Sequence, residues 1–370
     1  MYIHQRKDWP AFVWDREKLL ESLAVVTHNQ GRLLGRMYDL GFSLKAEATL
    51  QAMTLEVLKS NEIEGENLDI NQVRSSIARH LGMDVAGLVP TDRNVDGVVE
   101  MMLDATQNYQ VDLTPERLFG WHKLLFPFGH NSKNKMIVGA WRNNTMNDPM
   151  QVVSGAMGKE KVHFEAPASE LLEEEMNDFL NWFNTSSQDH GLIKAAVAHL
   201  WFVTIHPFDD GNGRIARTIA DMMLARADGT HQRFYSMSAQ IKIERKDYYD
   251  LLEKTQKGTL DITEWILWFL KCLDSALLAA NEITERVIKK SLYWEWLGTK
   301  SLTDRQHLMV NKLLDGFDGK LTSSKWAKIA KCSQDTALRD IQDLMEKRVL
   351  EKETSGGRST NYRLAVINSF

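Results

Sequence analysis

The chain has 370 residues, enough for two or three domains, and its 43% hydrophobic and 26% charged residues are typical of a globular protein. The 45 Lys and Arg against 50 Asp and Glu leave a net charge of −5, which by itself indicates neither a nucleic-acid nor a membrane partner. Two cysteines cannot build a disulfide framework, and the first residues lack the apolar stretch of a signal peptide. We therefore expect a cytoplasmic protein, and not a secreted, fibrous, disordered or membrane-spanning one.

Few prolines and long helical patterns predict a mainly α-helical fold. Residues 1–92 are predicted to form an N-terminal helical domain. In it, residues 15–39 show the periodicity of an amphipathic helix, and residues 44–60 predict a second helix after Gly41. The segment from Pro90 to Asp92 predicts a connection to the next domain.

Residues 93–290 are predicted to form the second domain, which is helical except for residues 136–167. In that exception, QVVSG (151–155) and KVHFEAP (161–167) are short runs with β-branched residues on either side of AMGKE. This pattern predicts a β-hairpin. Two strands alone are marginally stable, so the hairpin must pack on the helices or accept a partner strand.

Residues 299–370 predict a third domain, with two helices joined by a turn and then two short strands around Ser355-Gly356-Gly357. This order is the pattern of a winged helix. The segment has 13 Lys and Arg and 9 Asp and Glu, a net charge of 13 − 9 = +4. Winged helices bind DNA or dock proteins, and both roles stay open. In DNA binding the phosphate contacts would come from Lys325, Lys328, Lys331, Arg339 and Arg358.

The most informative segment runs from residue 192 to residue 227. An almost wholly apolar stretch, 192–205, predicts a buried central helix, which His206-Pro207 should end. The loop DDGNG then leads into a second helix near Arg214. Glycines that turn amides inward, together with the positive end of a helix, make an anion site. Arg214 and Arg217 are three residues apart and so project from one side of the first helical turn.

The other groups near this loop supply reactive chemistry. Asp210 offers a hard oxygen ligand of the kind Mg²⁺ prefers, and His206 can accept a proton near neutral pH. A base, a metal ligand, a phosphate cradle and two guanidinium groups predict a site of phosphoryl or nucleotidyl transfer. A single histidine at a helix end, or a single Gly-Asn-Gly, is more often structural than catalytic. The combination within twelve residues is what favours function.

HPFDDGNGRIAR resembles the signature of the Fic family, H-P-F-x-[DE]-G-N-G-R-x-x-R, with each defined position filled. The resemblance implies a Fic-type helical core with a β-hairpin flap, over roughly residues 95–275, and transfer of AMP from ATP to a protein hydroxyl. It implies that His206 is the catalytic base, that Asp210 holds Mg²⁺ and that Phe208 is an apolar anchor of the loop. Asp209 occupies a variable position and is assigned no role. The ATP site would comprise Asp210, Gly211, Asn212, Gly213, Arg214, Ile215, Ala216, Arg217, Tyr248, Tyr249 and Gln256.

The same resemblance extends to a second motif. Ser60, Glu64 and Gly65 match S/T-x-x-x-E-G/N, the inhibitory motif of the family, and precede the catalytic core. A carboxylate at Glu64 would pair bidentately with Arg217 and compete with the γ-phosphate. Glu62 and Glu66 have the wrong spacing to Ser60. By the same resemblance, the hairpin would dock the target segment by strand addition through Gln151, Val152, Val153 and Ser154.

Three functions follow as alternatives. The first is a self-inhibited protein adenylyltransferase that uses ATP and Mg²⁺ and modifies a protein target, with the chain itself as one candidate. The second is the reverse reaction, in which Glu64 and His206 remove AMP from a modified protein. The third is a nucleotide-sensing regulator that binds DNA through residues 299–370. A metal hydrolase is disfavoured, because His199 and His206 lack a third ligand and His199 fits a buried helix position. We expect a homodimer and no membrane partner.

Overall fold

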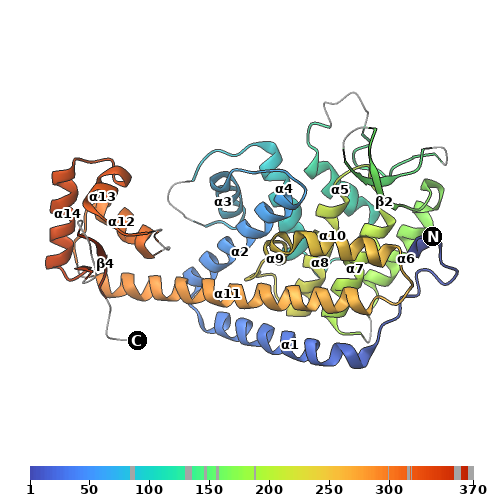
Figure 1. Cartoon of the computed structure of the whole chain (residues 1–370), viewed down its shortest axis with the longest axis horizontal. Helices are drawn as coiled ribbons and strands as arrows, with labels where there is room; N and C mark the ends of the chain where they lie inside the picture. Colours follow the sequence, from blue (N-terminus) through green and yellow to red (C-terminus); the bar gives the residue numbers. More distant parts are fainter. Residues whose placement is uncertain are drawn as a thin grey trace. The chain divides into compact units, whose positions relative to one another are not determined.

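A computed structural model of the chain describes residues 1–83, 88–129, 136–145, 148–155, 158–186, 189–298, 300–314, 317, 319–353 and 360–365. These residues are mostly helical and include only short strand pairs, which confirms the predicted mainly α class (Figure 1). The chain forms two compact units, residues 1–281 and 282–370. The predicted boundary near residue 92 lies within the first unit and stays a prediction. No helix of the described residues is long and apolar enough to cross a membrane.

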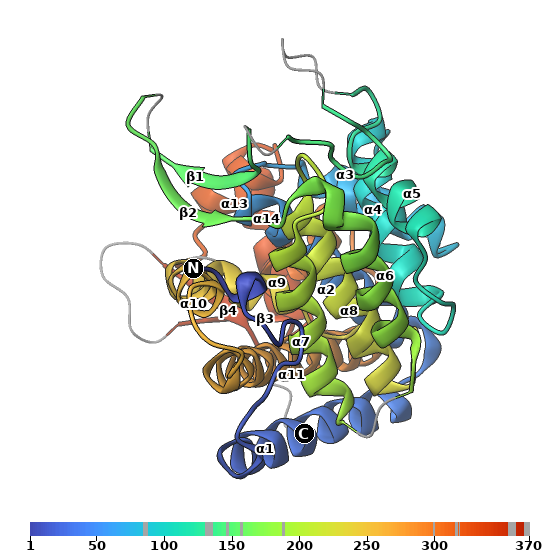
Figure 2. The same cartoon turned by 90° about the vertical axis from the view of Figure 1, so that its right-hand side faces the viewer.

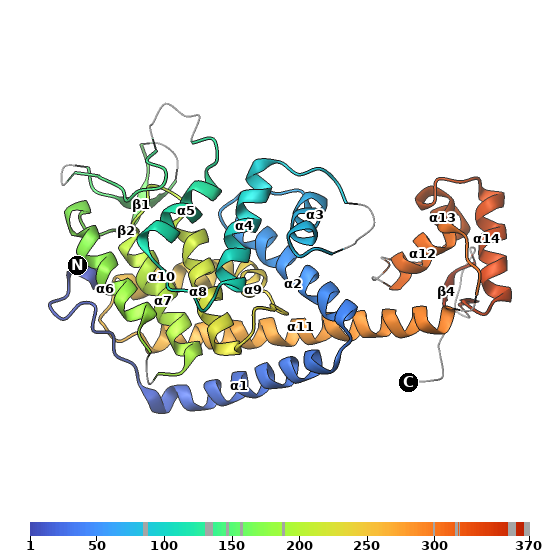
Figure 3. The ribbon, with the colours of Figure 1, turned by 180° about the vertical axis from the view of Figure 1, so that it is seen from behind.

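The N-terminal part of the first unit consists of three helices. They are α1 (Arg16–Asp39), α2 (Phe42–Ile63) and α3 (Ile70–His80). Asp15 caps α1 and Asp69 caps α3, because each carboxylate accepts hydrogen bonds from the first amides of its helix. The helix α1 lies alongside the first part of α11 (Thr263–Leu297), as Figures 1 and 3 show, and a hydrogen bond of 2.6 Å from Asn29 to Asp274 joins them.

The rest of the first unit packs around the predicted apolar helix. That helix is α7 (Gly191–Ile205), whose residues from Leu192 onward are all buried, and α8 (Asn212–Asp228) packs directly against it. The helices around this pair are α4 (Arg93–Gln107), α5 (Pro115–Leu125), α6 (Leu172–Asn184), α9 (Met237–Ile243) and α10 (Arg245–Gln256). Since α7 has no polar face, burial on every side is what its sequence requires.

The predicted hairpin forms from β1 (Gln151–Ser154) and β2 (Lys161–Glu165), which pair antiparallel. Figure 2 shows the hairpin lying above α10. The side chain of Phe164 is 1% exposed and contacts the rings of Tyr2 and His4 edge-on, at 5.1 and 5.7 Å between ring centroids. This aromatic contact anchors the hairpin to the N-terminal segment.

The second unit has its own core around Trp326, Ile341 and Leu344, which are fully buried. After the end of α11 come α12 (Asp304–Leu314), α13 (Ser323–Ile329), α14 (Gln334–Glu346), β3 (Leu350–Lys352) and β4 (Tyr362–Leu364). The two strands pair antiparallel, and Tyr362 also bridges to Leu321. Helices followed by a strand pair are the elements that the sequence predicts here, while the predicted turn at Ser355-Gly356-Gly357 lies outside the described residues.

Candidate active site

The exit from α7 places His206 in an unusual backbone conformation. Its φ of 54° and ψ of 56° lie in the left-handed region, which a non-glycine residue rarely occupies. Arg142 holds this turn from outside, because its Nε donates to the carbonyl of His206 at 2.7 Å and its Nη2 to that of Pro167 at 2.6 Å. The guanidinium of Arg142 is buried, and burial lowers its pKa to about 10. The sequence analysis did not identify Arg142, which lies 64 residues upstream.

The imidazole of His206 has one nitrogen available to accept a proton. Its Nδ1 lies 3.2 Å from the carbonyl oxygen of Val203, and since a carbonyl only accepts, Nδ1 carries the hydrogen. In the neutral ring Nε2 is then an acceptor. Burial lowers the pKa of His206 to about 4, against a smaller rise from the Val203 carbonyl. The ring is therefore neutral at physiological pH, as a general base must be.

Residues 206–217, here called the motif loop, are held closed by Asn212. The side-chain oxygen of Asn212 accepts from the amide of Phe208 at 3.0 Å, and its nitrogen donates to the carbonyl of Phe208 at 2.7 Å. Phe208 is fully buried, which confirms its predicted place as an apolar anchor. Its ring stacks on that of His122, with 4.2 Å between centroids. Gly211 has a φ of 80°, a conformation that glycine adopts without strain.

The two aspartates of the motif loop have different surroundings. A side-chain oxygen of Asp209 accepts from the amide of Ile137 at 2.8 Å, so this variable position ties the loop to the segment before the hairpin. Asp210 is exposed, and one of its oxygens accepts from the amide of Gly211 at 2.6 Å. Its backbone carbonyl accepts from Nε2 of His122 at 3.2 Å. Asp210 thus keeps one carboxylate oxygen toward solvent beside the start of α8.

Arg217 is 2% exposed and is held by residues from the end of α2. Its Nε donates to Oγ of Ser60 at 2.9 Å, and its Nη2 donates to the carbonyl of Ser60 and pairs with Glu64, both at 2.8 Å. The predicted pairing of Arg217 with Glu64 is therefore present, but it is not bidentate. The second carboxylate oxygen of Glu64 lies 3.4 Å from the hydroxyl of Tyr249 instead, and Nη1 of Arg217 has no acceptor among the described residues.

The carboxylate of Glu64 lies directly over the motif loop. A Cβ atom built on Gly213 would be 2.2 Å from Oε1 of Glu64, so only glycine at this position admits the carboxylate. Burial by itself would raise the pKa of Glu64, but Arg217 outweighs burial and, with smaller help from Arg214, lowers it below its ordinary value. Glu64 is therefore ionised at physiological pH and sits where an anion bound to the loop would sit.

Arg214 is paired with a carboxylate from the same segment. Its Nη1 lies 2.7 Å from an oxygen of Glu66 and 3.5 Å from the side-chain oxygen of Asn61, and its guanidinium lies over the ring of Phe126. The sequence analysis set Glu66 aside on its spacing to Ser60. That judgement was incomplete, because the chain turns at Gly65, whose φ is 88°, and brings Glu66 back toward the loop. Residues 60–66 are called the inhibitory segment below.

Two buried N–H groups of the motif arginines lack a partner. Among the described residues, Nε of Arg214 and Nη1 of Arg217 are buried without a hydrogen-bond acceptor. Buried donors are almost always satisfied, so these two N–H groups are available to an anionic ligand. Together with the first amides of α8, which have no acceptor within their own helix, these groups fit phosphate oxygens.

Cations from α9 and α10 hold the inhibitory segment in place. Nζ of Lys242 donates to the carbonyl of Glu62 at 2.7 Å, and Nε of Arg245 donates to that of Ile63 at 2.9 Å. Both bonds go to the last turn of α2, where carbonyls lack partners within the helix. Glu64 itself follows α2 as its C-terminal cap. Neither Lys242 nor Arg245 was identified from the sequence, because no local motif links them to residues 180 positions away.

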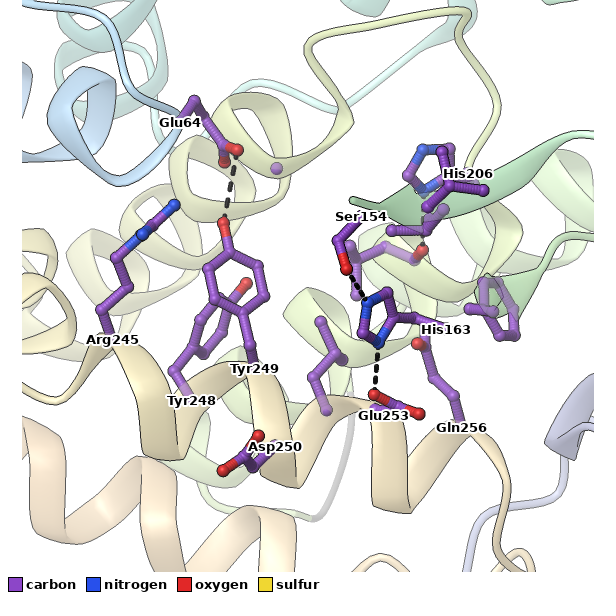
Figure 4. Close-up of a pocket in the computed structure, with 16 residues that line it drawn as sticks. Glu64, Ser154, His163, His206, Arg245, Tyr248, Tyr249, Asp250, Glu253 and Gln256 are labelled. Atoms are coloured by element: carbon purple, nitrogen blue, oxygen red, sulfur yellow. Dashed lines mark hydrogen bonds and ion pairs between the residues drawn. The ribbon is translucent and has the colours of Figure 1, made fainter. Parts of the chain in front are cut away.

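A cavity of about 500 Å³ opens between the motif loop, the hairpin and α10 (Figure 4). Glu64, His206 and Gly213 line one part of it, and α10 lines the opposite wall with residues that include Tyr248, Tyr249 and Gln256. The three residues of α10 that were predicted for the ATP site therefore line the same cavity as the predicted base.

These three residues differ in their contacts. Tyr248 is 1% exposed, and its hydroxyl lies 3.0 Å from Nε2 of His199, a buried helix residue as predicted. Gln256 donates to the hydroxyl of Thr204 at 3.3 Å. The hydroxyl of Tyr249 points to Glu64.

Other predicted residues are placed less directly at the cavity. Ile215 and Ala216 are fully buried in the core, so their side chains are not available to ATP and only their backbone could contact it. Val152, Val153 and Ser154 of the hairpin line the cavity. Gln151, at the far end of β1, instead donates to Glu165 on the neighbouring strand at 2.9 Å.

Comparison with known protein families agrees with this geometry. Residues 112–224, which contain α7, the motif loop and most of α8, match the model of the Fic/DOC family. This part of the chain is therefore similar to a Fic domain. Residues 2–83, upstream of it, match a domain of unknown function, DUF4172. The inhibitory segment therefore lies within the region that matches DUF4172, whereas Arg214 and Arg217, with which it pairs, lie within the region that matches the Fic/DOC model.

Curated relatives of this chain are named as adenylyltransferases. The protein adenylyltransferase Fic of Nematostella vectensis is 31% identical over 156 residues, which are 42% of this chain and 31% of the relative. That of Drosophila melanogaster is 26% identical over 278 residues, 73% of this chain and 50% of the relative. The chain spans between about a third and a half of the length of these two relatives.

Solved structures support the fold. A Fic family protein from Desulfovibrio desulfuricans G20 superposes with a TM-score of 0.53 at 20% identity, covering 94% of this chain and 97% of that one. A Fic domain containing signaling protein from Bacteroides thetaiotaomicron superposes with a TM-score of 0.52 at 19% identity, over 72% of this chain and 97% of that one. At these identities the likeness concerns the fold alone.

Proposed function

We propose that the chain is a self-inhibited protein adenylyltransferase, which transfers AMP from ATP to a Tyr, Thr or Ser hydroxyl of a protein and releases pyrophosphate. One observation carries the proposal. The carboxylate of Glu64 pairs with Arg217 over Gly213, in the same cavity as the available Nε2 of His206. An anion site and a neutral base thus share one cavity, and a carboxylate of the chain itself occupies the anion site. The names of the curated relatives support the same activity.

In the proposed reaction His206 acts on the acceptor. Its Nε2 accepts the proton of the target hydroxyl while the hydroxyl oxygen forms a bond to the α-phosphorus of ATP. The bond from that phosphorus to the bridging oxygen breaks, and pyrophosphate leaves. Arg214, Arg217 and the amides at the start of α8 hold the phosphates, so that attacking and leaving oxygens lie in line.

Asp210 fits a role as a ligand of Mg²⁺. Its exposed carboxylate keeps one oxygen toward solvent next to the phosphate-binding start of α8. The described residues contain no group of three or more potential metal-ligating side chains, and Mg²⁺ in nucleotide sites commonly uses one or two carboxylates together with substrate phosphates. Bound there, Mg²⁺ would neutralise charge that develops on the phosphates.

Inhibition follows from competition for the two arginines. With Glu64 on Arg217 and Glu66 on Arg214, both guanidinium groups are already paired with anions. ATP that enters the cavity must displace these carboxylates or bind with its phosphates shifted, and a shift of about 1 Å can cost a hundredfold in rate. The resting protein is therefore expected to be slow.

Three purified proteins test the proposal, incubated with Mg²⁺ and ATP labelled at the α-phosphate. They are the unchanged chain, Glu64→Gly, and Glu64→Gly with His206→Ala. We expect weak covalent label on the first, strong label on the second and none on the third. Absence of label from all three defeats the proposal, and intact mass of Glu64→Gly distinguishes added AMP from added phosphate.

Removal of AMP is the second candidate, and one observation favours it. Glu64 and His206 line the same cavity, and both are in the protonation state that would let them activate a water molecule. Release of AMP from pre-modified protein that stops in Glu64→Gly would support this reaction. The two candidates are thus separated by the same substitution, which stimulates transfer and abolishes removal.

The second unit gives less support to a DNA-binding regulator. Arg339 is exposed on α14, but the exposed residues of that helix also include Asp335 and Glu346. Acidic side chains on the face that would meet phosphates weaken DNA binding. Of the other predicted contacts, Lys325, Lys328 and Lys331 are exposed, and Arg358 lies outside the described residues. DNA binding, protein docking and the expected homodimer stay predictions.

A further inference from the structure

The hairpin above the cavity contains an irregularity at one residue. Val152 pairs with Phe164 and Val153 pairs with Val162, so His163 is an extra residue in β2 with no partner in β1. Such a bulge bends the strand and re-aims the side chain of the extra residue. His163 is directed to the cavity, whose wall it lines with Ser154 and Glu253 (Figure 4).

Both ring nitrogens of His163 are engaged. Nδ1 lies 2.5 Å from a carboxylate oxygen of Glu253 on α10, and Nε2 lies 2.6 Å from Oγ of Ser154 on β1. A carboxylate only accepts, so Nδ1 carries a hydrogen. Nε2 accepts from the Ser154 hydroxyl in a neutral ring and donates to it in a charged one, since a hydroxyl can do either. The three residues therefore stay bonded in both charge states of the ring.

Glu253 is a permanently charged anchor for this contact. Its other oxygen lies 2.6 Å from Nζ of Lys257, while Nζ of Lys161 lies 3.9 Å away. The hydrogen bond from Lys257 and then that from His163 lower the pKa of Glu253 to about 2. The carboxylate is thus ionised at physiological pH, and α10 offers His163 a charged partner.

The contact from Ser154 through His163 to Glu253 holds β1, the strand of the hairpin that has fewer other contacts. Within the described residues β1 pairs only with β2, so its outer edge is open to another strand. Val153 is 49% exposed near that edge. An isolated two-stranded hairpin is marginally stable, and the buried Phe164 anchors β2 rather than β1. Among the described residues, the contact from Ser154 through His163 to Glu253 joins the end of β1 to the helix that forms the cavity wall.

We propose that His163 is a positioning residue, which holds the open edge of β1 at the rim of the cavity so that an extended acceptor segment pairing with that edge presents its hydroxyl to His206. The inference rests on the proposed function and adds to it a residue outside both sequence motifs. Strand addition recruits an acceptor through its backbone. The position of the edge, and not its side chains, then decides where the acceptor hydroxyl lies.

The test uses the full chain carrying Glu64→Gly, with His163→Ala, Glu253→Ala, His163→Gln or the control His28→Ala added one at a time. Glutamine at 163 can donate to Glu253 and accept from Ser154, so it restores the contact without the ring. His28 is exposed on α1 and away from the hairpin. Hydrogen exchange of the hairpin amides measures the contact, and labelling by α-labelled ATP, with the chain itself as acceptor, measures its use.

We expect His163→Ala and Glu253→Ala to speed exchange in β1 about tenfold and to lower the maximal labelling rate about tenfold, with KM for ATP changed less than twofold. His163→Gln should recover most of both losses, and His28→Ala should match the parent. If His163→Ala leaves the exchange rate of the β1 amides unchanged, the inference is wrong, while the proposed function is unaffected. A loosened β1 with an unchanged labelling rate also overturns it. Absence of label from the Glu64→Gly parent defeats the proposed function, and this inference with it.

Discussion

The motif loop and the inhibitory segment meet at Arg217 but are held in place differently. The loop is closed by bonds between near neighbours, such as those from Asn212 to Phe208 four residues away. The inhibitory segment is held by contacts that span up to 182 residues, from Ser60 to Arg217 and from Ile63 to Arg245. A structure closed by local bonds remains when its partner leaves. The phosphate site should therefore persist after the inhibitory segment withdraws.

The two regions also differ in what they present to a ligand. The motif loop offers donors, two of which lack any partner among the described residues, whereas the inhibitory segment offers carboxylates in the same place. In the proposed function, a nucleotide and the inhibitory segment compete for one set of groups. The four predictions below test this competition, from the largest expected effect to the smallest.

Gly213→Ala should abolish transfer even though it breaks the inhibitory contact. The new Cβ would lie 2.2 Å from Oε1 of Glu64 and so must expel it, but it also fills the space above the loop amides. Added to Glu64→Gly, it should lower the labelling rate by about 10²- to 10³-fold, since loop donors contribute that much to transfer reactions. Gly120→Ala is the control, because nothing lies within 4 Å of a Cβ there. Strong labelling by the Gly213 variant would contradict the idea that Glu64 and the phosphates of ATP occupy the same space above the loop.

Glu64→Gln should activate the protein partially. The amide keeps the size of the side chain and still accepts a hydrogen bond from Arg217, but it loses the attraction between opposite charges. Hydrogen bonds to charged groups exceed neutral ones by about 1 kcal/mol or more, so labelling should rise roughly tenfold over the unchanged chain. It should stay below that of Glu64→Gly. Equal rates for Gln and Gly variants would mean that charge alone, and not occupancy, inhibits.

Glu66→Gln should strengthen ATP binding, with a smaller effect than the substitutions above. Glu66 pairs with Arg214 at 2.7 Å, but its side chain is 50% exposed, so the pair contributes within the range of surface ion pairs, up to about 1 kcal/mol. In the Glu64→Gly background we expect KM for ATP to fall about two- to fivefold. Glu62→Gln is the matched control, because Glu62 pairs with Lys59 and not with either motif arginine. An equal effect of both substitutions would exclude a specific role for Glu66.

The rate of Glu64→Gly should hardly depend on pH between about 6 and 8. Burial lowers the pKa of His206 to about 4, and a base whose pKa lies below the working pH is already neutral and active. The negative charge of Glu64 raises the pKa of His206 slightly. In Glu64→Gly the rate should therefore start to fall only at a still lower pH, where His206 becomes protonated. Initial rates at constant ionic strength measure this. If the rate instead fell to half near pH 6.5, the ordinary pKa of histidine, that result would contradict the hydrogen-bonded, buried state of the ring.

The sequence was informative wherever function depends on neighbours in the chain. The helix exit at His206, the loop from Phe208 to Gly213 and the arginines of α8 follow from apolar patterning, proline and glycine, and they form as predicted. The pairing of Glu64 with Arg217 was predicted too, through a motif and not through physics. Its detailed geometry differs from the predicted bidentate pair, since one oxygen of Glu64 lies near Nη2 of Arg217 and the other near the hydroxyl of Tyr249.

Residues that act across the fold carried no sequence signal. Arg142 supports the His206 turn, Glu66 pairs with Arg214, and Lys242 and Arg245 hold the end of α2. Each is a common charged residue with no local pattern, and a charge is usually a solvated surface group. His163 is similar: strand periodicity cannot reveal a bulge, because the extra residue is defined only by the register of its partner strand.

The sequence by itself thus determined the helical class, the central buried helix and the closed loop from His206 to the start of α8, because bonds within one or two turns of chain form these features. Only the tertiary structure decided which carboxylates face the two arginines, which cations hold the inhibitory segment and where the hairpin meets α10. Those contacts depend on how α2, α8, α10 and β2 pack, and packing brings together residues that chain distance and composition leave unrelated.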